Sequence, residues 1–114
     1  PQDAAVELVQ AMYSNAVADG YEMRQRTLRP VYVGTLKVQM IAEYRGAELT
    51  GRVLRIENKG DQSVELTESM IAPSSALAVS IAESKLAPGK VTTAYLVSQN
   101  GPSPLAGQNT LTGR

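Results

Sequence analysis

The side chains of this 114-residue chain that could do chemistry are its carboxylates, because the sequence contains no His and no Cys. It therefore lacks thiolate and imidazole nucleophiles, the usual zinc ligands and a general base that titrates near neutral pH. Two carboxylate pairs are candidates for acid and base catalysis, Glu65 with Glu68 and Glu57 with Asp61. Glu65 alternates with apolar neighbours, which places it on a solvated strand face, whereas a catalytic acid must be desolvated.

The motifs that support common reactions are missing from the sequence. It has no Walker phosphate loop, no Gly-x-Ser-x-Gly elbow, no Ser-x-x-Lys pair, no EF-hand loop and no Asn-x-Ser/Thr sequon. We therefore expect a protein that is not an enzyme, with no catalytic residue, no metal ligand and no cofactor.

Charged residues are grouped along the chain although the net charge is zero. Residues 1–23 carry four acids and no base, while residues 24–59 carry eight bases and three acids. A neutral protein with separated charge blocks can pair head to tail around a ring. The bases include Arg24, Arg26, Arg29, Arg52 and Arg55, but no aromatic residue interleaves the run, so we expect no specific nucleic-acid binding.

Aromatic side chains are limited to five tyrosines, because Phe and Trp are absent. A carbohydrate-binding accessory or hydrolase would need a stacking platform made from Tyr13, Tyr21, Tyr32, Tyr44 and Tyr95. We interpret each of these tyrosines as a core or interface residue.

An amphipathic helix is predicted over residues 3–19. Asp3 can accept hydrogen bonds from free N–H groups at its start, and Gly20 follows its end. The apolar arc is wide enough to pack on its own domain or to meet a neighbouring subunit. Within that arc, the face that we expect to pack on the rest of the domain, and which is also a candidate partner surface, contains Val9, Met12, Tyr13 and Ala16.

Two-residue alternation of apolar side chains predicts five strands, at residues 36–42, 51–57, 63–68, 76–82 and 91–98. The segments 51–57 and 63–68 are expected to form a hairpin around the turn residues 58–61. Both faces of segment 91–98 are largely apolar, which predicts a central strand.

The predicted fold is mainly β, an antiparallel β-sandwich of immunoglobulin-like or barrel-like form with one N-terminal amphipathic α-helix. Residues 1–98 are expected to form a single domain and residues 99–114 a flexible tail, because the tail is rich in turn-formers and has no periodicity. The chain begins with Pro1 rather than Met, so we expect a fragment or a processed chain.

Two blocks of sequence resemble the TraK C-terminal domain family, named for the secretin-like outer-membrane core component of F-type conjugative type IV secretion systems. The first block is Arg52-Val-Leu-Arg-Ile-Glu-Asn-Lys59, a polar turn and Val64-Glu-Leu-Thr-Glu-Ser69. The second is Leu86-Ala-Pro-Gly-Lys-Val-Thr-Thr-Ala-Tyr-Leu-Val97. The helix with Leu8, Val9 and Ala11, followed by Gly20-Tyr21, is also similar to the family. Met70-Ile71 stands where the family tends to place an aromatic residue, so both are further candidate partner-binding residues.

The resemblance implies a periplasmic β-sandwich domain associated with the outer membrane, which is the C-terminal part of a longer protein. It implies a ring of copies of the chain with a TraV-like lipoprotein and a TraB-like envelope-spanning scaffold, serving DNA and protein transfer and pilus assembly. Open sheet edges would offer such partners backbone hydrogen-bonding groups for strand addition.

An alternative function is that of a periplasmic immunoglobulin-like chaperone or adhesion module. Asn-Lys turns followed by alternating Val-x-Leu strands, as at residues 58–66, are common in such folds. A chaperone would form small complexes with pilin subunits, whereas a core component would form large rings.

Overall fold

A computed structural model describes residues 2–16, 20–25, 28–73 and 75–100 of the chain. The main sheet is antiparallel and six-stranded, with the order β1-β3-β4-β8-β6 and with β2 also paired to β3. Its strands are β1 (Glu22–Gln25), β2 (Val31–Val33), β3 (Leu36–Arg45), β4 (Leu49–Asn58), β6 (Ala76–Ile81) and β8 (Val91–Gln99). A second, two-stranded sheet pairs β5 (Val64–Glu65) with β7 (Lys85–Leu86). The helices are α1 (Gln2–Ser14) and α2 (Glu68–Ile71).

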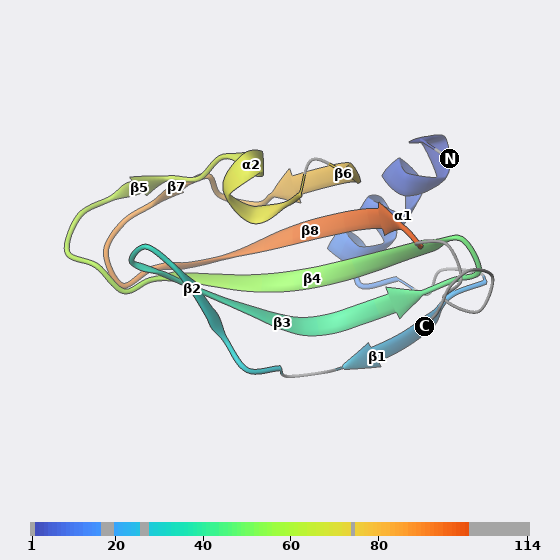
Figure 1. Cartoon of the computed structure of the whole chain (residues 1–114), viewed down its shortest axis with the longest axis horizontal. Helices are drawn as coiled ribbons and strands as arrows, with labels where there is room; N and C mark the ends of the chain where they lie inside the picture. The colour runs from blue at the N-terminus through green and yellow to red at the C-terminus, as the bar shows by residue number, and fades with distance from the viewer. Residues whose placement is uncertain (1, 17–19, 26–27, 74, 101–114) are drawn as a thin grey trace, which may run out of the picture.

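The prediction of a mainly antiparallel β fold with an N-terminal helix is confirmed, and the arrangement is compatible with a β-sandwich. Figure 1 shows α1 at one end of the main sheet, with β5 and β7 at the other end and α2 beside β6. Of the helices that the structure describes, none has the length and apolar character needed to cross a membrane.

The predicted central position of the last strand is confirmed, since β8 lies between β4 and β6. Residues paired across neighbouring strands project to the same face of a sheet, and successive residues alternate between faces. Tyr44, Gly51 and Val97 therefore share one face, because Gly51 pairs with both of the others. Leu54, three residues along β4, faces the opposite side. The sheet thus has an apolar core on each face.

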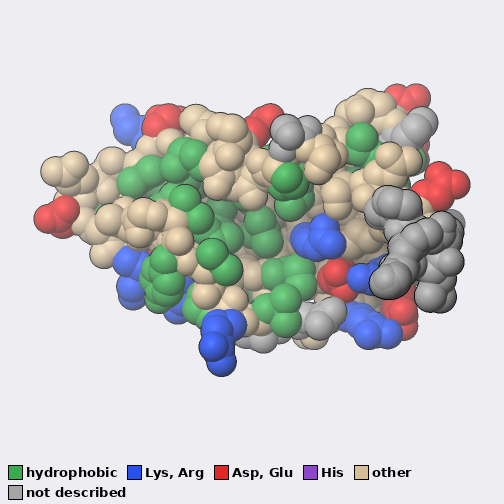
Figure 2. Space-filling model, in the orientation of Figure 1, with side chains coloured by type: hydrophobic (Ala, Val, Ile, Leu, Met, Phe, Trp, Pro, Cys, Tyr) green, Lys and Arg blue, Asp and Glu red, His purple; other side chains and the backbone are tan. Residues whose placement is uncertain are grey.

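The first core lies under α1. Its buried members are Ala5, Leu8, Met12, Tyr44, Leu49, Tyr95 and Val97. The three helical residues recur at spacings of three and four, so they form one stripe on α1. The second core lies on the opposite face and joins the main sheet to the small one through Leu36, Leu54, Ile56, Leu66, Leu86 and Ala94. Figure 2 shows hydrophobic side chains gathered over this second face.

The helix ends earlier than predicted, at Ser14, and Asn15 rather than Gly20 forms its C-terminal cap. Asn15 has a φ of 57°, in the left-handed region. Its N–H donates to the Met12 carbonyl at 3.2 Å, and the Ala16 N–H donates to the Ala11 carbonyl at 2.8 Å. These two hydrogen bonds form a Schellman motif, which Asn can supply as well as Gly. At the other end, Asp3 lies within the first turn, and residues 17–19 of the predicted helix lie outside the described residues.

The predicted hairpin of segments 51–57 and 63–68 is wrong. β4 pairs with β3 and β8, while β5 pairs with β7. The fully buried Asn58 redirects the chain, because its Nδ2 donates to the carbonyls of Gln62, at 2.8 Å, and Leu86, at 3.0 Å. Its Oδ1 accepts the Gly60 N–H at 2.9 Å. These bonds hold the turn against β7, so the following strand joins the small sheet.

Other strand limits also differ from the expected ones. The strand predicted at 63–68 shortens to Val64–Glu65, because the helical turn of α2 begins at Glu68. The strands β1, β2 and β7 were not predicted. Simple alternation along β3 predicts that Met40 and Ala42 lie on the same face. The register shifts between them, so they lie on opposite faces.

Candidate interaction surface

The structure places the predicted partner-binding residues in two sets on opposite faces of the main sheet. Val9, Met12 and Tyr13 belong to α1, Ala16 follows it, and Met70 and Ile71 belong to α2. Met12 is buried in the first core, and Ile71 packs against the second. Ala16 is exposed, and Tyr13 and Met70 keep 65% and 36% of their surface exposed. Partner binding by these residues stays a prediction.

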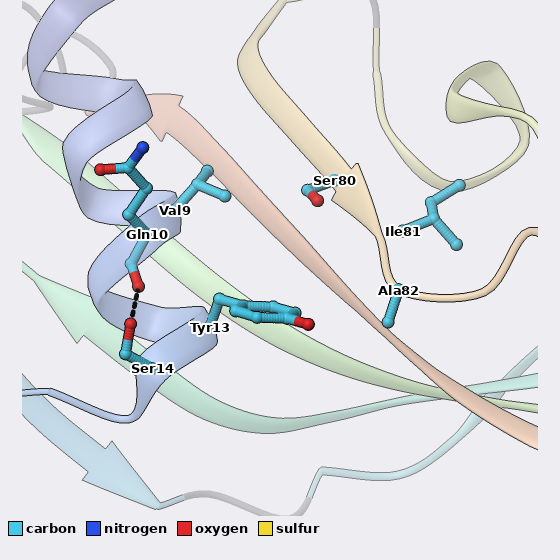
Figure 3. A pocket seen from close by; sticks show the side chains of 7 residues that line it. All are labelled: Val9, Gln10, Tyr13, Ser14, Ser80, Ile81 and Ala82. Carbon is cyan, nitrogen blue, oxygen red and sulfur yellow. Dashed lines mark hydrogen bonds between the residues drawn. The ribbon is translucent and has the colours of Figure 1, made fainter.

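A hollow of about 620 Å³ separates α1 from β6 and is lined by Val9, Gln10, Tyr13, Ser14, Ser80, Ile81 and Ala82. Figure 3 shows the Tyr13 ring extending from α1 toward β6, with Val9 above it on the same side of the helix. Val9 is half-buried and packs against the first core, whereas Tyr13 is exposed. The predicted helix face thus packs on the sheet only in part, and its outer half forms the wall of this hollow.

A second hollow, of about 580 Å³, lies between α2 and the same strand, β6. It is lined by Glu68, Ser69, Ala72, Pro73, Ala76 and Val79. In the register of β6 with β8, Val79 pairs with Leu96 and Ser80 pairs with Tyr95, so these neighbouring residues face opposite sides of the sheet. The two hollows therefore flank β6 on its two faces.

The outer edge of β6 presents backbone groups that the sheet does not use. The Ala82 N–H donates to the Thr93 carbonyl at 2.9 Å. Because backbone groups of an antiparallel strand alternate in direction, those of Val79 and Ile81 point away from β8. Near the start of the strand, the Gln2 Nε2 donates to the Leu77 carbonyl at 2.7 Å, which ties α1 to this edge. The rest of the edge is suited to strand addition.

The opposite edge of the main sheet is formed by β1 and β2, two strands that the sequence pattern does not predict. Exposed large hydrophobic side chains gather there, namely Met23, Leu28, Val31, Tyr32 and Val33. The signal that could have found β2 is Val31-Tyr32-Val33, three residues of high β propensity directly before Gly34. Gly34 has a φ of 60°, as a tight turn into β3 requires.

The tyrosines divide between core and surface. Tyr44 and Tyr95 are buried in the first core, Tyr21 packs against it, and Tyr13 and Tyr32 are exposed. The rings of Tyr13 and Tyr95 meet edge to face, with centroids 5.6 Å apart. Burial raises the pKa of the Tyr95 hydroxyl above its ordinary value of 10.0, and the neighbouring Tyr13 raises it further.

The candidate catalytic carboxylates have other partners. Glu57 forms ion pairs with Arg55 at 3.4 Å and with Lys59 at 3.7 Å. Glu65 is exposed, as expected for a solvated strand face, and accepts a hydrogen bond from Ser84 Oγ at 3.1 Å. Within the described parts of the chain, no three His, Cys, Asp or Glu residues gather closely enough to hold a metal ion.

Several members of the basic run are paired with acids of the same sheet. Arg24 lies 3.5 Å from Glu22, and the buried Glu43 lies 3.7 Å from Arg45 and 3.9 Å from Arg52. Arg26 lies outside the described residues. These ion pairs offset part of the positive charge of the run within the sheet.

Residues 1–98 match the model of a protein family described as the TraK C-terminal domain. The match covers α1 and nearly all of the main sheet, and it ends one residue before the end of β8. No curated protein sequence matches the chain.

Proposed function

Because the chain belongs to the TraK C-terminal domain family, we propose that it is a structural subunit of the outer-membrane core complex of a conjugative type IV secretion system. Family membership identifies a TraK-like component of conjugation and type IV secretion. The ring, its partners and its place in the cell envelope are the proposed part. The family match over residues 1–98 is the observation that carries the proposal.

The surface of the domain supports an assembly role. Both edges of the main sheet keep backbone groups and large apolar side chains accessible, and hollows flank β6 on both faces. Exposed strand edges attract other chains unless a partner covers them. In the proposed complex the covering chains are further copies of this chain, a TraV-like lipoprotein and a TraB-like scaffold, and the domain lies in the periplasm against the outer membrane.

The test is the native mass of the complex after mild-detergent extraction from an envelope that makes the whole transfer apparatus, with its partners identified. We expect a megadalton ring that contains the lipoprotein and the scaffold. An envelope lacking only the TraV-like lipoprotein is the matched control, and there the complex should shrink or dissociate. A small complex with pilin subunits would instead establish the chaperone alternative, and a bare monomer would refute the assembly role.

A substitution on α1 tests whether its predicted face contributes. Val9→Asp places a charge at a half-buried position against the first core, so we expect loss of folding or of assembly. The control is Ala4→Asp on the same helix, because Ala4 is exposed and lines neither hollow. If Val9→Asp leaves both folding and assembly unchanged, this face of α1 has no such role.

A further inference from the structure

The exposed apolar side chains of the domain lie mainly at the two opposite edges of the main sheet. On the β2 side these are Leu28, Val31, Tyr32 and Val33. Beside β6 they are Val6 and Tyr13 of α1 and Met70 of α2. Val6 and Tyr13 lie on the same stripe of α1 as Gln2, whose side chain bonds to β6. Each edge therefore combines open backbone groups with apolar surface.

The two edges carry opposite charge. The charged residues of α1 are Asp3 and Glu7, and Glu68 lines the hollow between α2 and β6. On the other side, Arg29 lies two residues before β2. Two β6 edges would bring like charges together, whereas a β6 edge and a β2 edge attract each other.

We propose that the β2 edge of one copy docks on the β6 edge of the next copy, with Tyr32 seated in the hollow between α1 and β6. This inference rests on the proposed ring. A contact between two different edges can repeat from copy to copy, and the series of copies closes into a ring when the rotation between neighbours permits. The contact covers both open edges of every copy at once.

The sheet topology fixes the direction and the face of this contact. Four antiparallel pairings separate β2 from β6, so the two strands run in the same direction within one copy. In one copy Tyr32 is level with Glu57 of β4 and Ser80 is level with Val53, so bringing Tyr32 beside Ser80 needs an offset of four residues along the strands. Rotation about an axis inclined to the strands provides such an offset, as the tilted strands of a barrel do, and β2 then pairs with the neighbouring β6 in parallel. The faces of the sheet are then continuous across the contact.

The same register decides which side chains meet. Tyr32 pairs with Lys37 of β3, and Lys37 pairs with Glu57 of β4. Glu57 and Gly51 lie an even number of residues apart on β4, so both face the side of the sheet that α1 covers. Tyr32 therefore projects to the α1 side of the neighbouring β6, where Tyr13 and Ser80 line the hollow. When Tyr32 lies beside Ser80 of the neighbouring copy, Arg29, three residues earlier, is level with the start of that copy's β6. Glu68 of the neighbouring copy lines the hollow beside the same part of β6.

Disulfide trapping tests this contact directly, because the chain has no cysteine of its own. The variant carries Tyr32→Cys and Ser80→Cys. Within one copy these positions are four strand spacings apart across the sheet, about 19 Å, and four residues apart along the strands. A disulfide needs Cα atoms within about 7 Å. We expect mild oxidation of the assembled protein to give a ladder of covalent multimers. The control is Val91→Cys with Ser80→Cys, since Val91 is exposed on the same face outside the contact and should give no ladder.

Each single-cysteine variant should stay monomeric after oxidation. Dimers of Tyr32→Cys alone or of Ser80→Cys alone would show symmetric edge contacts and overturn the proposal. So would the absence of a ladder from a double variant that folds, as judged by circular dichroism. A disulfide to a different protein would assign the edge to another partner and also overturn it.

A charge exchange provides a second readout that does not depend on cysteine. Arg29→Glu or Glu68→Arg alone should weaken self-association about fivefold, the effect of one exposed ion pair. The combined variant should restore it. If the combined variant associates no better than either single one, these two side chains do not meet.

The outcomes separate this contact from the proposed function. A megadalton envelope complex without the disulfide ladder would leave the function standing and refute the edge contact. A ladder from the purified protein without an envelope complex would support the edge contact and refute the function.

Discussion

Gly51 of β4 lies directly beneath Met12 of α1. A Cβ added at Gly51 would come within 2.7 Å of the Met12 Sδ and 3.0 Å of the Leu8 Cδ2, closer than side chains tolerate. A side chain at this position would press on the ends of the Met12 and Leu8 side chains, which would have to shift to admit it. Glycine thus allows these two side chains of α1 to lie against the backbone of β4.

Gly51→Ala is expected to destabilise the fold by about 1 kcal/mol, because the ends of the buried Met12 and Leu8 side chains must shift to admit the new methyl group. Denaturant unfolding measures the change. Combining it with Met12→Ala should cost less than the sum of the two single substitutions, since the shorter side chain makes room for the methyl group. Strict additivity would show that the two residues do not press on each other.

Asn58→Ala is expected to cost about 1–3 kcal/mol in the free energy of unfolding, because it leaves the buried Leu86 carbonyl and the partly buried backbone groups of Gly60 and Gln62 without their partner. Lys59→Ala at the neighbouring exposed position is the control and should change stability little. Thermal unfolding of both variants provides the comparison. Equal stability of the two would contradict the role of Asn58 in joining the sheets.

Asn15→Ala is expected to destabilise the domain by about 1 kcal/mol, because alanine is strained at the positive φ of the helix cap. Asn15→Gly should be as stable as the original protein or more so, since glycine adopts this conformation freely. The difference between the two variants isolates the backbone effect. If both lose the same stability, the Asn side chain rather than its φ holds the helix end.

Stability is expected to fall in alkaline solution through Tyr95. Its pKa is raised in the folded state, so the unfolded chain releases the hydroxyl proton first. The contribution of Tyr95 is complete below the ordinary value of 10.0 and is lost as the pH rises through the folded-state pKa. Tyr95→Phe should remove this part of the decline, measured as the unfolding free energy against pH. An unchanged slope in the variant would rule out Tyr95 as its source.

The candidate interaction surface could be predicted only in part. The pattern of α1 placed Val9, Met12, Tyr13 and Ala16 on one face, but it could not show that Met12 is buried while Tyr13 stays exposed. Periodicity describes one element at a time, whereas exposure depends on what covers that element. The β6 and β2 edges depend on strand order, and a single sequence carries little information about strand order.

Local side-chain pattern and motif order are enough to predict the apolar helix, the strand character of β3, β4, β6 and β8, the central place of β8 and the family. That β4 pairs with β3 and β8 rather than with β5 becomes visible only in the folded chain, because strand pairing depends on contacts between residues far apart in the sequence. The end of α1 at Asn15 is a local cap that the apolar periodicity does not reveal. The Asn58 side chain binds Leu86, 28 positions away, and α1 settles where Gly51 leaves space.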